Sequence, residues 1–426
     1  MSTAAAMSDL VPPELTKACA EVGVAGPDDA VGGRQARFVA TPASTEEAAG
    51  LLRAAAGLGL SIAPRGSGSR LGWGLPPRSC DLIVDTRRLD LVIEHAAGDL
   101  VVSVQSGVDL AALSDRLAAQ GQRLALDPPG GGTVGGLIAT GVAGPLRLRY
   151  GAPRDLLIGI TVVRADGTAA KAGGKVVKNV AGYDLGKLFA GSYGTLGLIT
   201  EATFRLHPRP PASTYVVLNC PDPETAAAAV QAAASSPLAP AAIEMSWPSA
   251  AETVRIAVLL EGDADGVAER AARLQLLLPG GQATAEPPPW WAWAGDSDQT
   301  VLRIGFWPGQ LSRVLADITS AAAAAGLEPA VAGSAAAGVL HLALDGPVPA
   351  KAVNQLLTSL RAGPARVAAA ATPDGCASVV VLHAPPAVRD AVDMWGPAPA
   401  ANLMRAIKDQ FDPEHRMAPG RFAAGL

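Results

Sequence analysis

Two glycine-rich segments, PRGSGSRLG at 64–72 and PPGGGTVGG at 128–136, constrain this chain more than any other feature. Glycine has no Cβ, so its backbone can approach a ligand closely and let several N–H groups converge on one anion. Serine hydroxyls and Arg70 add donors and a cation to the first segment. In the second, glycines surround Thr133, and GGLIATG at 135–141 can begin a helix whose N-terminus favours an anion. Either segment alone could be a flexible loop, but the two together predict a pocket for a phosphate-bearing ligand.

The second segment also contains the pattern G-x-G-x-x-G, at Gly130, Gly132 and Gly135, with Asp155 about 20 residues later, as in a Rossmann dinucleotide site. A Rossmann loop leaves its strand directly, whereas Asp-Pro-Pro at 127–129 intervenes here. The context therefore disfavours a Rossmann fold. The pattern G-x-x-x-x-G-K-[ST] occurs nowhere in the chain, which excludes a P-loop.

Length and composition indicate an ordinary globular protein. A chain of 426 residues, 49% of them hydrophobic and 17% charged, is long enough for two or three domains. The net charge of -5 gives no reason to expect a nucleic acid or an anionic membrane as a partner. The N-terminus shows no export signal, and no stretch is long and apolar enough to predict a transmembrane helix. Small molecules and other proteins are the expected partners.

The cysteines predict no metal centre. They are scattered along the chain, without a C-x-x-C pair or the spacing of a zinc or iron–sulfur site. We expect structural thiols in a reducing compartment. The four are Cys19, Cys80, Cys220 and Cys376.

Local patterns predict an α/β first part of the chain. Ser44 and Glu47 have capping-box spacing and open an amphipathic helix, and Asp109 can cap a second one. A turn at Asp166-Gly167 joins two strands, and a half-buried strand closes this part near Pro211. We also expect short strands in one small sheet at 61–64, 81–85, 91–95 and 100–105.

From about residue 212 the sequence becomes rich in alanine and proline and predicts a separate α+β domain. The tryptophan-rich stretch 285–298 is expected to be a surface loop, either a partner contact or a cluster packed on the domain. Leu403, Ile407 and Phe411 at i, i+4 spacing predict a docked C-terminal helix. Strands are expected at 215–220, 254–262, 300–307, 338–346 and 378–383, and helices at 223–234, 263–278, 310–325 and 349–361.

Several segments carry a family resemblance: PRGSGSRLG, DPPGGGTVGGLIATGVAG, RYGAPRDLLIGITVVRADG, KVVKNVAGYDLGKLFAGSYGTLGLITEATFRL and FDPEHRMAPGR. Together they resemble the FAD-binding domain of the vanillyl-alcohol oxidase and p-cresol methylhydroxylase (PCMH) superfamily, and within it the FAD-binding subunits of bacterial glycolate oxidase. The resemblance implies an α+β fold with a PCMH-type FAD-binding domain of two subdomains and a smaller α+β cap. The implied division is 1–34 N-terminal segment, 35–211 FAD domain, 212–398 cap, and 399–426 C-terminal helix and tail packing back on the FAD domain.

The resemblance also implies which residues hold FAD. The first segment takes the pyrophosphate, the second takes a phosphate and faces the flavin, and part of GSYGTLGLIT lies beside the cofactor. Some relatives attach FAD to a histidine at the position of Ser69, so the binding here is expected to be non-covalent. The predicted cofactor-binding residues are Pro64, Arg65, Gly66, Ser67, Gly68, Ser69, Arg70, Pro128, Gly131, Gly132, Thr133, Val134, Gly135, Gly136, Ala139, Thr140, Gly141, Gly194, Leu198 and Ile199.

The resemblance further implies an FAD-dependent oxidoreductase subunit of a glycolate oxidase, with a homologous flavoprotein catalytic subunit and an iron–sulfur subunit as partners. Two departures move catalysis toward the partner: Tyr193 stands where catalytic relatives carry glutamate, and the histidines are isolated, which also predicts no metal site. A cytoplasmic location, with membrane association through partners, is expected. Alternatives are a self-sufficient dehydrogenase of another 2-hydroxyacid or sugar derivative and a non-catalytic structural subunit.

Oxidation of a 2-hydroxyacid needs a base near the hydroxyl and a cation for the carboxylate. The sequence nominates no such pair, so the catalytic residues stay unknown. A structural role is the first expectation for His341 and His383, which lie at strand-like positions. The same holds for other residues near the matched motifs: Arg149, Tyr150, Lys178, Tyr183, Lys187 and Lys408.

Overall fold

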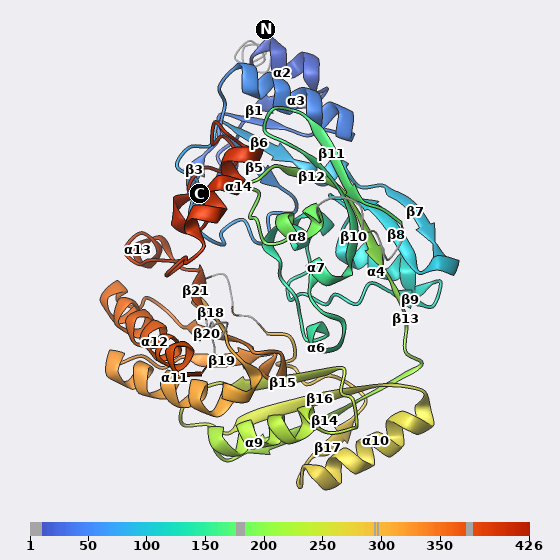
Figure 1. Cartoon of the computed structure of the whole chain (residues 1–426), viewed down its shortest axis with the longest axis vertical. Coiled ribbons are helices and arrows are strands. Elements are labelled where there is room, and N and C mark those ends of the chain that lie inside the picture. Colours follow the sequence, from blue (N-terminus) through green and yellow to red (C-terminus); the bar gives the residue numbers. More distant parts are fainter. Residues whose placement is uncertain (1–10, 176–183, 294, 296–297, 372–377) are drawn as a thin grey trace.

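The computed structural model describes residues 11–175, 184–293, 295, 298–371 and 378–426. Figure 1 shows two halves: an upper one built from the N-terminal part and the C-terminal tail, and a lower one built from the middle of the chain. The chain enters the lower half between β13 (His207–Pro208) and β14 (Ala212–Cys220), and it leaves after β21 (Ser378–His383). The expected α+β fold is confirmed.

The first sheet of the upper half has the order β1-β4-β6-β5 in the described chain. Its strands β4 (Phe38–Ala40), β6 (Leu82–Asp85) and β5 (Ile62–Arg65) are parallel, and β1 (Val22–Val24) is antiparallel to β4. Helix α3 (Thr45–Gly57) packs its apolar face on this sheet, beside α2 (Pro13–Ala18). A small hairpin, β2 (Ala30–Val31) and β3 (Arg34–Gln35), lies at the side.

The predicted start of α3 is confirmed, with one change in the cap. The Ser44 hydroxyl accepts from the Glu47 N–H at 3.0 Å, as expected of an N-cap. The Glu47 carboxylate, however, accepts from the N–H of Ala43 at 2.6 Å and from that of Ala20 at 2.9 Å rather than from Ser44. The side chain thereby ties the helix to the end of α2.

The second sheet has the order β11-β10-β12-β8-β7. The predicted turn at Asp166-Gly167 joins its antiparallel strands β10 (Leu157–Val163) and β11 (Ala169–Gly173). The expectation of one small sheet for residues 61–105 is wrong. β5 and β6 belong to the first sheet, whereas β7 (Val92–Ala96) and β8 (Val101–Gln105) belong to the second, because β8 pairs with the distant β12 (Leu198–Arg205). Local pattern gives strands but not their partners.

Short helices connect the strands of the upper half. The Asp109 carboxylate caps α4 (Leu110–Ala118) as predicted. The stretch GGLIATG forms most of α5 (Val134–Thr140), which Thr133 caps. The remaining elements are η1 (Thr86–Arg88), η2 (Ala97–Asp99), β9 (Gln122–Arg123), α6 (Arg147–Tyr150), α7 (Pro153–Leu156) and α8 (Leu185–Phe189).

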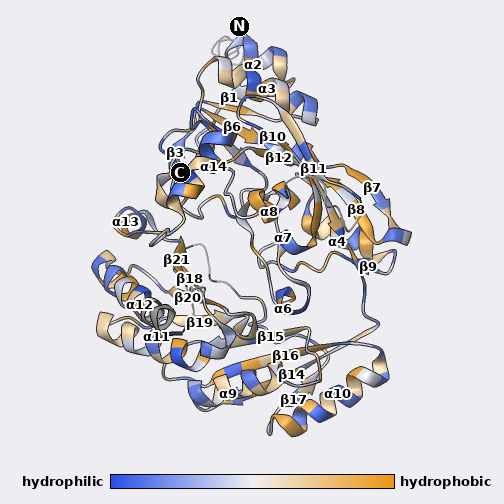
Figure 2. Cartoon of the chain, viewed as in Figure 1, coloured by the Kyte–Doolittle hydropathy of each residue, from blue (hydrophilic) through white to orange (hydrophobic). Residues whose placement is uncertain are grey.

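The lower half is one antiparallel sheet with the order β17-β14-β16-β15-β19-β20-β18-β21 in the described chain. Its helices pack on one face. Strand alternation sends Leu302 and Leu342 toward these helices, and Arg303 and His341 toward the upper half. Figure 2, coloured by hydropathy, shows hydrophobic residues along β10 and β12 of the upper half.

Besides β14 and β21, the elements of the lower half are α9 (Pro223–Ala234), β15 (Ala242–Trp247), β16 (Val254–Gly262), α10 (Ala264–Leu277), β17 (Gln282–Thr284), β18 (Thr300–Gly305), η3 (Pro308–Gln310), α11 (Leu311–Ala325), β19 (Ala330–Gly333), η4 (Ala335–Ala337), β20 (Val339–Leu344) and α12 (Ala350–Ala371).

The tryptophan-rich loop packs on its own sheet. The Trp291 ring meets Tyr215 edge-on at 5.0 Å, and Arg255 lies 5.7 Å from the Trp290 ring. Trp293 joins the apolar cluster around Val301. Of the two expectations for this loop, the structure supports the local cluster.

After β21, α13 (Pro386–Arg389) leads to α14 (Ala401–Phe411) in the upper half, and η5 (Ala423–Gly425) ends the chain. Ile407 and Phe411 pack against the core of the second sheet, with the Phe411 ring 5.6 Å from that of Phe189. Leu403 is 64% exposed, so the prediction that it lies on the docked face of the helix is wrong. The only fully buried residue of α14 is Lys408.

A bidentate ion pair joins the two halves. Both guanidinium Nη atoms of Arg123 donate to the Glu261 carboxylate, at 2.7 and 2.6 Å, and Nη2 also donates to the Tyr150 hydroxyl at 2.7 Å. The two charged side chains are only 17% and 6% exposed. Removing one partner of such a pair leaves an uncompensated buried charge.

We therefore expect Arg123→Met to lower the free energy of unfolding by about 3–5 kcal/mol, because Glu261 loses its counter-ion. Urea unfolding measures the change. The control is Arg273→Met, which removes an exposed partner of Glu269 and should cost under about 0.5 kcal/mol. Equal stability of the two variants would contradict the role given to the buried pair.

Candidate cofactor site

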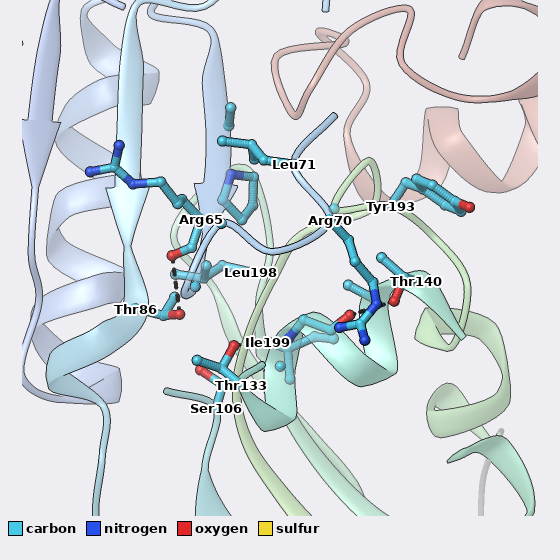
Figure 3. Close-up of a pocket in the computed structure, with 18 of the residues that line it drawn as sticks. Arg65, Arg70, Leu71, Thr86, Ser106, Thr133, Thr140, Tyr193, Leu198 and Ile199 are labelled. Atoms are coloured by element: carbon cyan, nitrogen blue, oxygen red, sulfur yellow. Dashed lines mark hydrogen bonds between the residues drawn. The ribbon is translucent and has the colours of Figure 1, made fainter. Parts of the chain in front are cut away.

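The two glycine-rich segments meet at one pocket in the upper half (Figure 3). The first segment follows from β5, the second forms the loop before α5, and GSYGTLGLIT forms the loop before β12 and the start of that strand. Segments far apart in sequence thus converge as the predicted phosphate site requires.

Most of the predicted cofactor-binding residues line this pocket. They come from all three segments and are Pro64, Arg65, Gly66, Ser67, Gly68, Ser69, Arg70, Thr133, Gly135, Gly136, Ala139, Thr140, Gly194, Leu198 and Ile199.

Five predicted residues lie outside the lining. Val134 is fully buried in the core beneath the pocket. Gly141 ends α5 with a φ of +63°, which favours glycine. A Cβ on Gly132 would lie 2.9 Å from the Ser69 hydroxyl, so its absence lets the two loops touch. Pro128 and Gly131 likewise belong to the second loop but not to the lining.

The two loops interlock at Gly66. A Cβ at this position would lie 2.2 Å from Oγ1 of Thr133, a separation that no side chain tolerates. The same hydroxyl accepts from the Gly136 N–H at 3.3 Å and so caps α5. A Cβ at Gly135 would lie 2.8 Å from the Ser106 side chain. Glycine is needed here for close approach between protein segments as well as to a ligand.

The guanidinium of Arg70 is hydrogen-bonded to the second loop, but its charge is not balanced by a carboxylate of the described chain. Its Nη1 donates to the Gly131 carbonyl at 2.8 Å and its Nη2 to the Pro129 carbonyl at 2.5 Å. The side chain is 8% exposed, and burial lowers the pKa of its guanidinium. Among the described residues no carboxylate forms an ion pair with it. A buried cation held by neutral carbonyls is stabilised by an anion in the pocket that it lines.

Arg65 has the opposite character. Its guanidinium forms ion pairs with Asp29 at 2.7 Å and with Asp85 at 3.0 Å, so its charge is already compensated. In Figure 3 its side chain points away from the loop that carries Arg70. Its carbonyl accepts from the Thr86 hydroxyl at 3.2 Å. Arg65 thus shapes the pocket with its backbone.

Sequence reasoning missed several lining residues: Ala63, Leu71, Thr86, Ser106, Tyr193, Gly197, Ala418 and Arg421. Gly197 belongs to a segment that the sequence had already singled out. Thr86 and Ser106 follow strands β6 and β8, a position that local pattern does not mark as functional. Ala418 and Arg421 come from the tail, which the resemblance had placed only on the FAD domain as a whole.

The pocket suits FAD. The dinucleotide brings two phosphate charges, and Arg70 offers a buried cation without a carboxylate partner. The Ser106 hydroxyl is buried in the lining of the same pocket and has no hydrogen-bond partner within the described chain, so it can donate to a ligand. Ser69 offers no histidine nitrogen for a covalent link.

The other candidates have structural roles where the structure describes them. The Tyr150 hydroxyl belongs to the Arg123–Glu261 pair, and Arg149 is exposed beside the Tyr150 ring. Lys187 is exposed and pairs with Asp184 at 3.3 Å. Lys178 and Tyr183 lie outside the described residues. Across the described ranges, no three His, Cys, Asp or Glu side chains gather as a metal site.

One polar group was not anticipated. Register places Arg303 of β18 directly opposite His341 of β20, on the face of the lower sheet that looks toward the upper half. Arg147 approaches from α6, which packs on β15 and η4. Burial, with the charges of both arginines, lowers the pKa of His341 to about 3. A neutral imidazole thus lies in the electrostatic field of two cations, neither of which has a hydrogen bond or ion pair within the described chain.

His383 lies elsewhere. Its Nδ1 is 3.1 Å from the Gln299 carbonyl, and its ring closes over Gly72 of the first loop. It lines a second hollow with Arg70 and Trp73. The expected structural role fits this hydrogen bond.

Comparison with known proteins agrees with the geometry. A family model described as FAD binding domain matches residues 36–173, and one described as FAD linked oxidases, C-terminal domain matches residues 209–277. Glycolate oxidase subunit GlcD of Bacillus subtilis is 34% identical over 208 residues, which are 48% of this chain and 44% of that protein. Glycolate oxidase subunit GlcE of Escherichia coli is 38% identical over 152 residues, 35% of this chain and 43% of that protein.

Other relatives carry different names. The mitochondrial D-lactate dehydrogenase [cytochrome] 1 of Saccharomyces cerevisiae is 36% identical over 43% of this chain and 32% of its own length. The chain thus matches less than half the length of these curated relatives. Among solved structures, alkyldihydroxyacetonephosphate synthase is similar with a TM-score of 0.67 and 18% identity, over 91% of this chain and 76% of that one. This likeness concerns the fold.

Residues 36–173 and 209–277 thus match the two domains of FAD-linked oxidases, the first of the PCMH type, and FAD is the cofactor. Within the described residues, no helix is long and apolar enough to cross a membrane.

The loop interlock gives a direct prediction. Gly66→Ala should weaken FAD binding at least tenfold, about 1.4 kcal/mol, because the new methyl group forces Thr133 and its loop away. Fluorescence titration of the apoprotein with FAD measures the affinity. Gly57→Ala, which meets open space, is the matched control. Adding Thr133→Ala to Gly66→Ala should restore part of the affinity, and strictly additive losses would contradict the interlock.

Proposed function

We propose that this chain is the FAD-binding subunit of a multi-subunit glycolate oxidase, which converts glycolate to glyoxylate and passes electrons on through a partner iron–sulfur subunit. The observation that carries the proposal is the pocket between the interlocked loops, with Arg70 as its buried unpaired cation. Two relatives bear the name of glycolate oxidase subunits, which supports the assembly with a homologous flavoprotein subunit. We further propose a cytoplasmic location, with any membrane contact made through partners.

Within this proposal each of the three segments contacts a different part of the cofactor. The first and second segments hold the pyrophosphate, where Arg70, the serine hydroxyls and backbone N–H groups supply donors. Gly194, Leu198 and Ile199 lie beside the flavin. Gly132, which lies outside the lining, acts by letting the two loops stay close. Bound FAD supplies a hydride acceptor, and this chain's residues bind and orient it.

A second candidate, a self-sufficient dehydrogenase of a 2-hydroxyacid, is favoured by the group around His341. Arg147 and Arg303 could hold a carboxylate, and the neutral imidazole could take the proton of a nearby hydroxyl. A bound carboxylate would offset both arginine charges and raise the pKa of His341 from about 3, which strengthens it as a base. This arrangement is the cation and base that the sequence did not nominate.

One experiment separates these functions. The purified chain should absorb near 450 nm, and anaerobic glycolate should leave that absorbance unchanged until the partner subunits are added. Bleaching of the isolated chain by glycolate or another 2-hydroxyacid would contradict the subunit role and support the second candidate. In that case Arg303→Met should slow bleaching about 10- to 100-fold, as expected for a lost charged hydrogen bond.

A protein without absorbance near 450 nm, and unable to take up added FAD, would overturn both proposals. That result would favour the remaining alternative, a non-catalytic structural subunit. Arg313→Met, which removes an exposed charge on α11, is the matched control for Arg303→Met and should change nothing.

A further inference from the structure

The C-terminal tail forms a wall of the cofactor pocket. The Ile62 N–H donates to the Arg416 carbonyl at 2.8 Å, and the Ala418 N–H donates back to the Ile62 carbonyl at 2.7 Å. The tail therefore runs alongside the start of β5 through one isolated parallel bridge, between Ile62 and Met417. Ala418 and Arg421 both line the pocket. The last residues of the chain are thus positioned to contact a bound cofactor.

Arg421 is a second buried cation at this pocket. One guanidinium nitrogen, Nη2, donates to the Leu71 carbonyl at 2.7 Å and to the Trp73 carbonyl at 3.2 Å. The residue is 6% exposed, and burial lowers its pKa to about 10, so it stays charged at neutral pH. In the described part of the chain, no carboxylate forms an ion pair with it.

The acidic groups nearest Arg421 do not compensate its charge. Burial raises the pKa of the Cys80 thiol to about 11, and burial also raises the pKa of the Tyr193 hydroxyl. Both groups are neutral at pH 7. A buried guanidinium surrounded by neutral groups is costly unless an anion joins it. Because Arg421 lines the cofactor pocket, its exposed surface is available to that anion.

A buried ion pair fixes the tail that carries Arg421. The Lys408 ammonium has three N–H donors and three acceptors: the Asp412 carboxylate at 2.6 Å and the carbonyls of Thr195 and Met417 at 2.6 and 2.9 Å. The Asp412 carboxylate also accepts from the N–H groups of Arg416 and Met417. Lys408 and Asp412 are 1% and 0% exposed.

This pair joins two walls of the pocket. Thr195 belongs to the GSYGTLG segment, whose Tyr193 and Gly194 line the pocket, and Met417 precedes Ala418. The Tyr193 ring also packs within 5.7 Å of Phe422, the residue after Arg421. A displacement of the tail would therefore displace the GSYGTLG segment, and a displacement of that segment would displace the tail.

We propose that Arg421 is a cofactor-contacting residue whose charge lies against the flavin, and that Lys408 and Asp412 are positioning residues that hold it there. The inference rests on the proposed FAD site. The two glycine-rich loops with Arg70 serve the pyrophosphate, which leaves the flavin as the group beside the tail and GSYGTLG. Reduced flavin carries more negative charge than oxidised flavin, so a fixed cation binds it more tightly.

The test compares Arg421→Met, Arg421→Lys and the control Arg405→Met, an exposed arginine on α14. The readouts are FAD affinity and the midpoint potential of bound FAD. In Arg421→Met we expect the affinity for reduced FAD to fall at least tenfold more than that for oxidised FAD. For a two-electron couple this is a shift of about 30 mV to more negative potential. Arg421→Lys should recover most of the shift, and Arg405→Met should show none.

The positioning role is tested with the double variant Lys408→Met/Asp412→Asn, which leaves no unpaired buried charge. It should lower FAD affinity and shift the potential in the same direction as Arg421→Met. An unchanged potential in Arg421→Met would overturn the flavin contact, even if the variant binds FAD less tightly. A wild-type chain that binds no FAD would overturn the proposed function itself. Arg70→Met should reduce affinity for both redox forms equally, which separates the two arginines.

Discussion

The contact between Arg70 and the carbonyls of Pro129 and Gly131 is the interaction on which the candidate site depends. It brings a charged side chain from the first glycine-rich loop onto the backbone of the second. Gly66 and Gly132 permit the approach, because a Cβ on either would strike the opposite loop. The desolvated guanidinium has no carboxylate within the described residues to balance it. The folded chain thus holds an uncompensated positive charge that an anionic cofactor neutralises. The glycines that let the loops meet are in this way linked to cofactor binding.

The second consequence concerns how the pocket is closed. Three walls come from the N-terminal half of the chain, and the fourth comes from residues beyond 411, after the chain has passed through the whole lower half. The Lys408–Asp412 pair and the Arg123–Glu261 pair hold these distant parts together. Both pairs are buried, so replacing only one partner of either pair would leave an uncompensated buried charge and destabilise the fold. Cofactor binding and the docking of the tail are therefore expected to support each other.

The sequence predicted what depends on local chemistry. The cap of α3 and the limits of α9 follow from residue types and spacing within a few positions, and the glycine content of the two segments marked them as parts of one site. It did not predict that β6 and β7 enter different sheets, because strand pairing depends on distant partners. It also missed β15, β17 and β19; the last two are only three and four residues long, too short for a clear alternating pattern. Arg303 and His341 look like ordinary strand residues until register places them side by side, and Arg421 becomes a pocket residue only when the tail docks.

The central claim, that the interlocked loops form a pyrophosphate site, is tested most directly by titrating the apoprotein with FAD and with FMN. FMN has the same flavin but lacks the pyrophosphate linkage and the adenosine. The account predicts one FAD per chain and binding of FMN at least 100-fold weaker, about 2.7 kcal/mol. ADP, which keeps the pyrophosphate, should compete with FAD. Equal affinity for FMN and FAD, together with no competition by ADP, would contradict it.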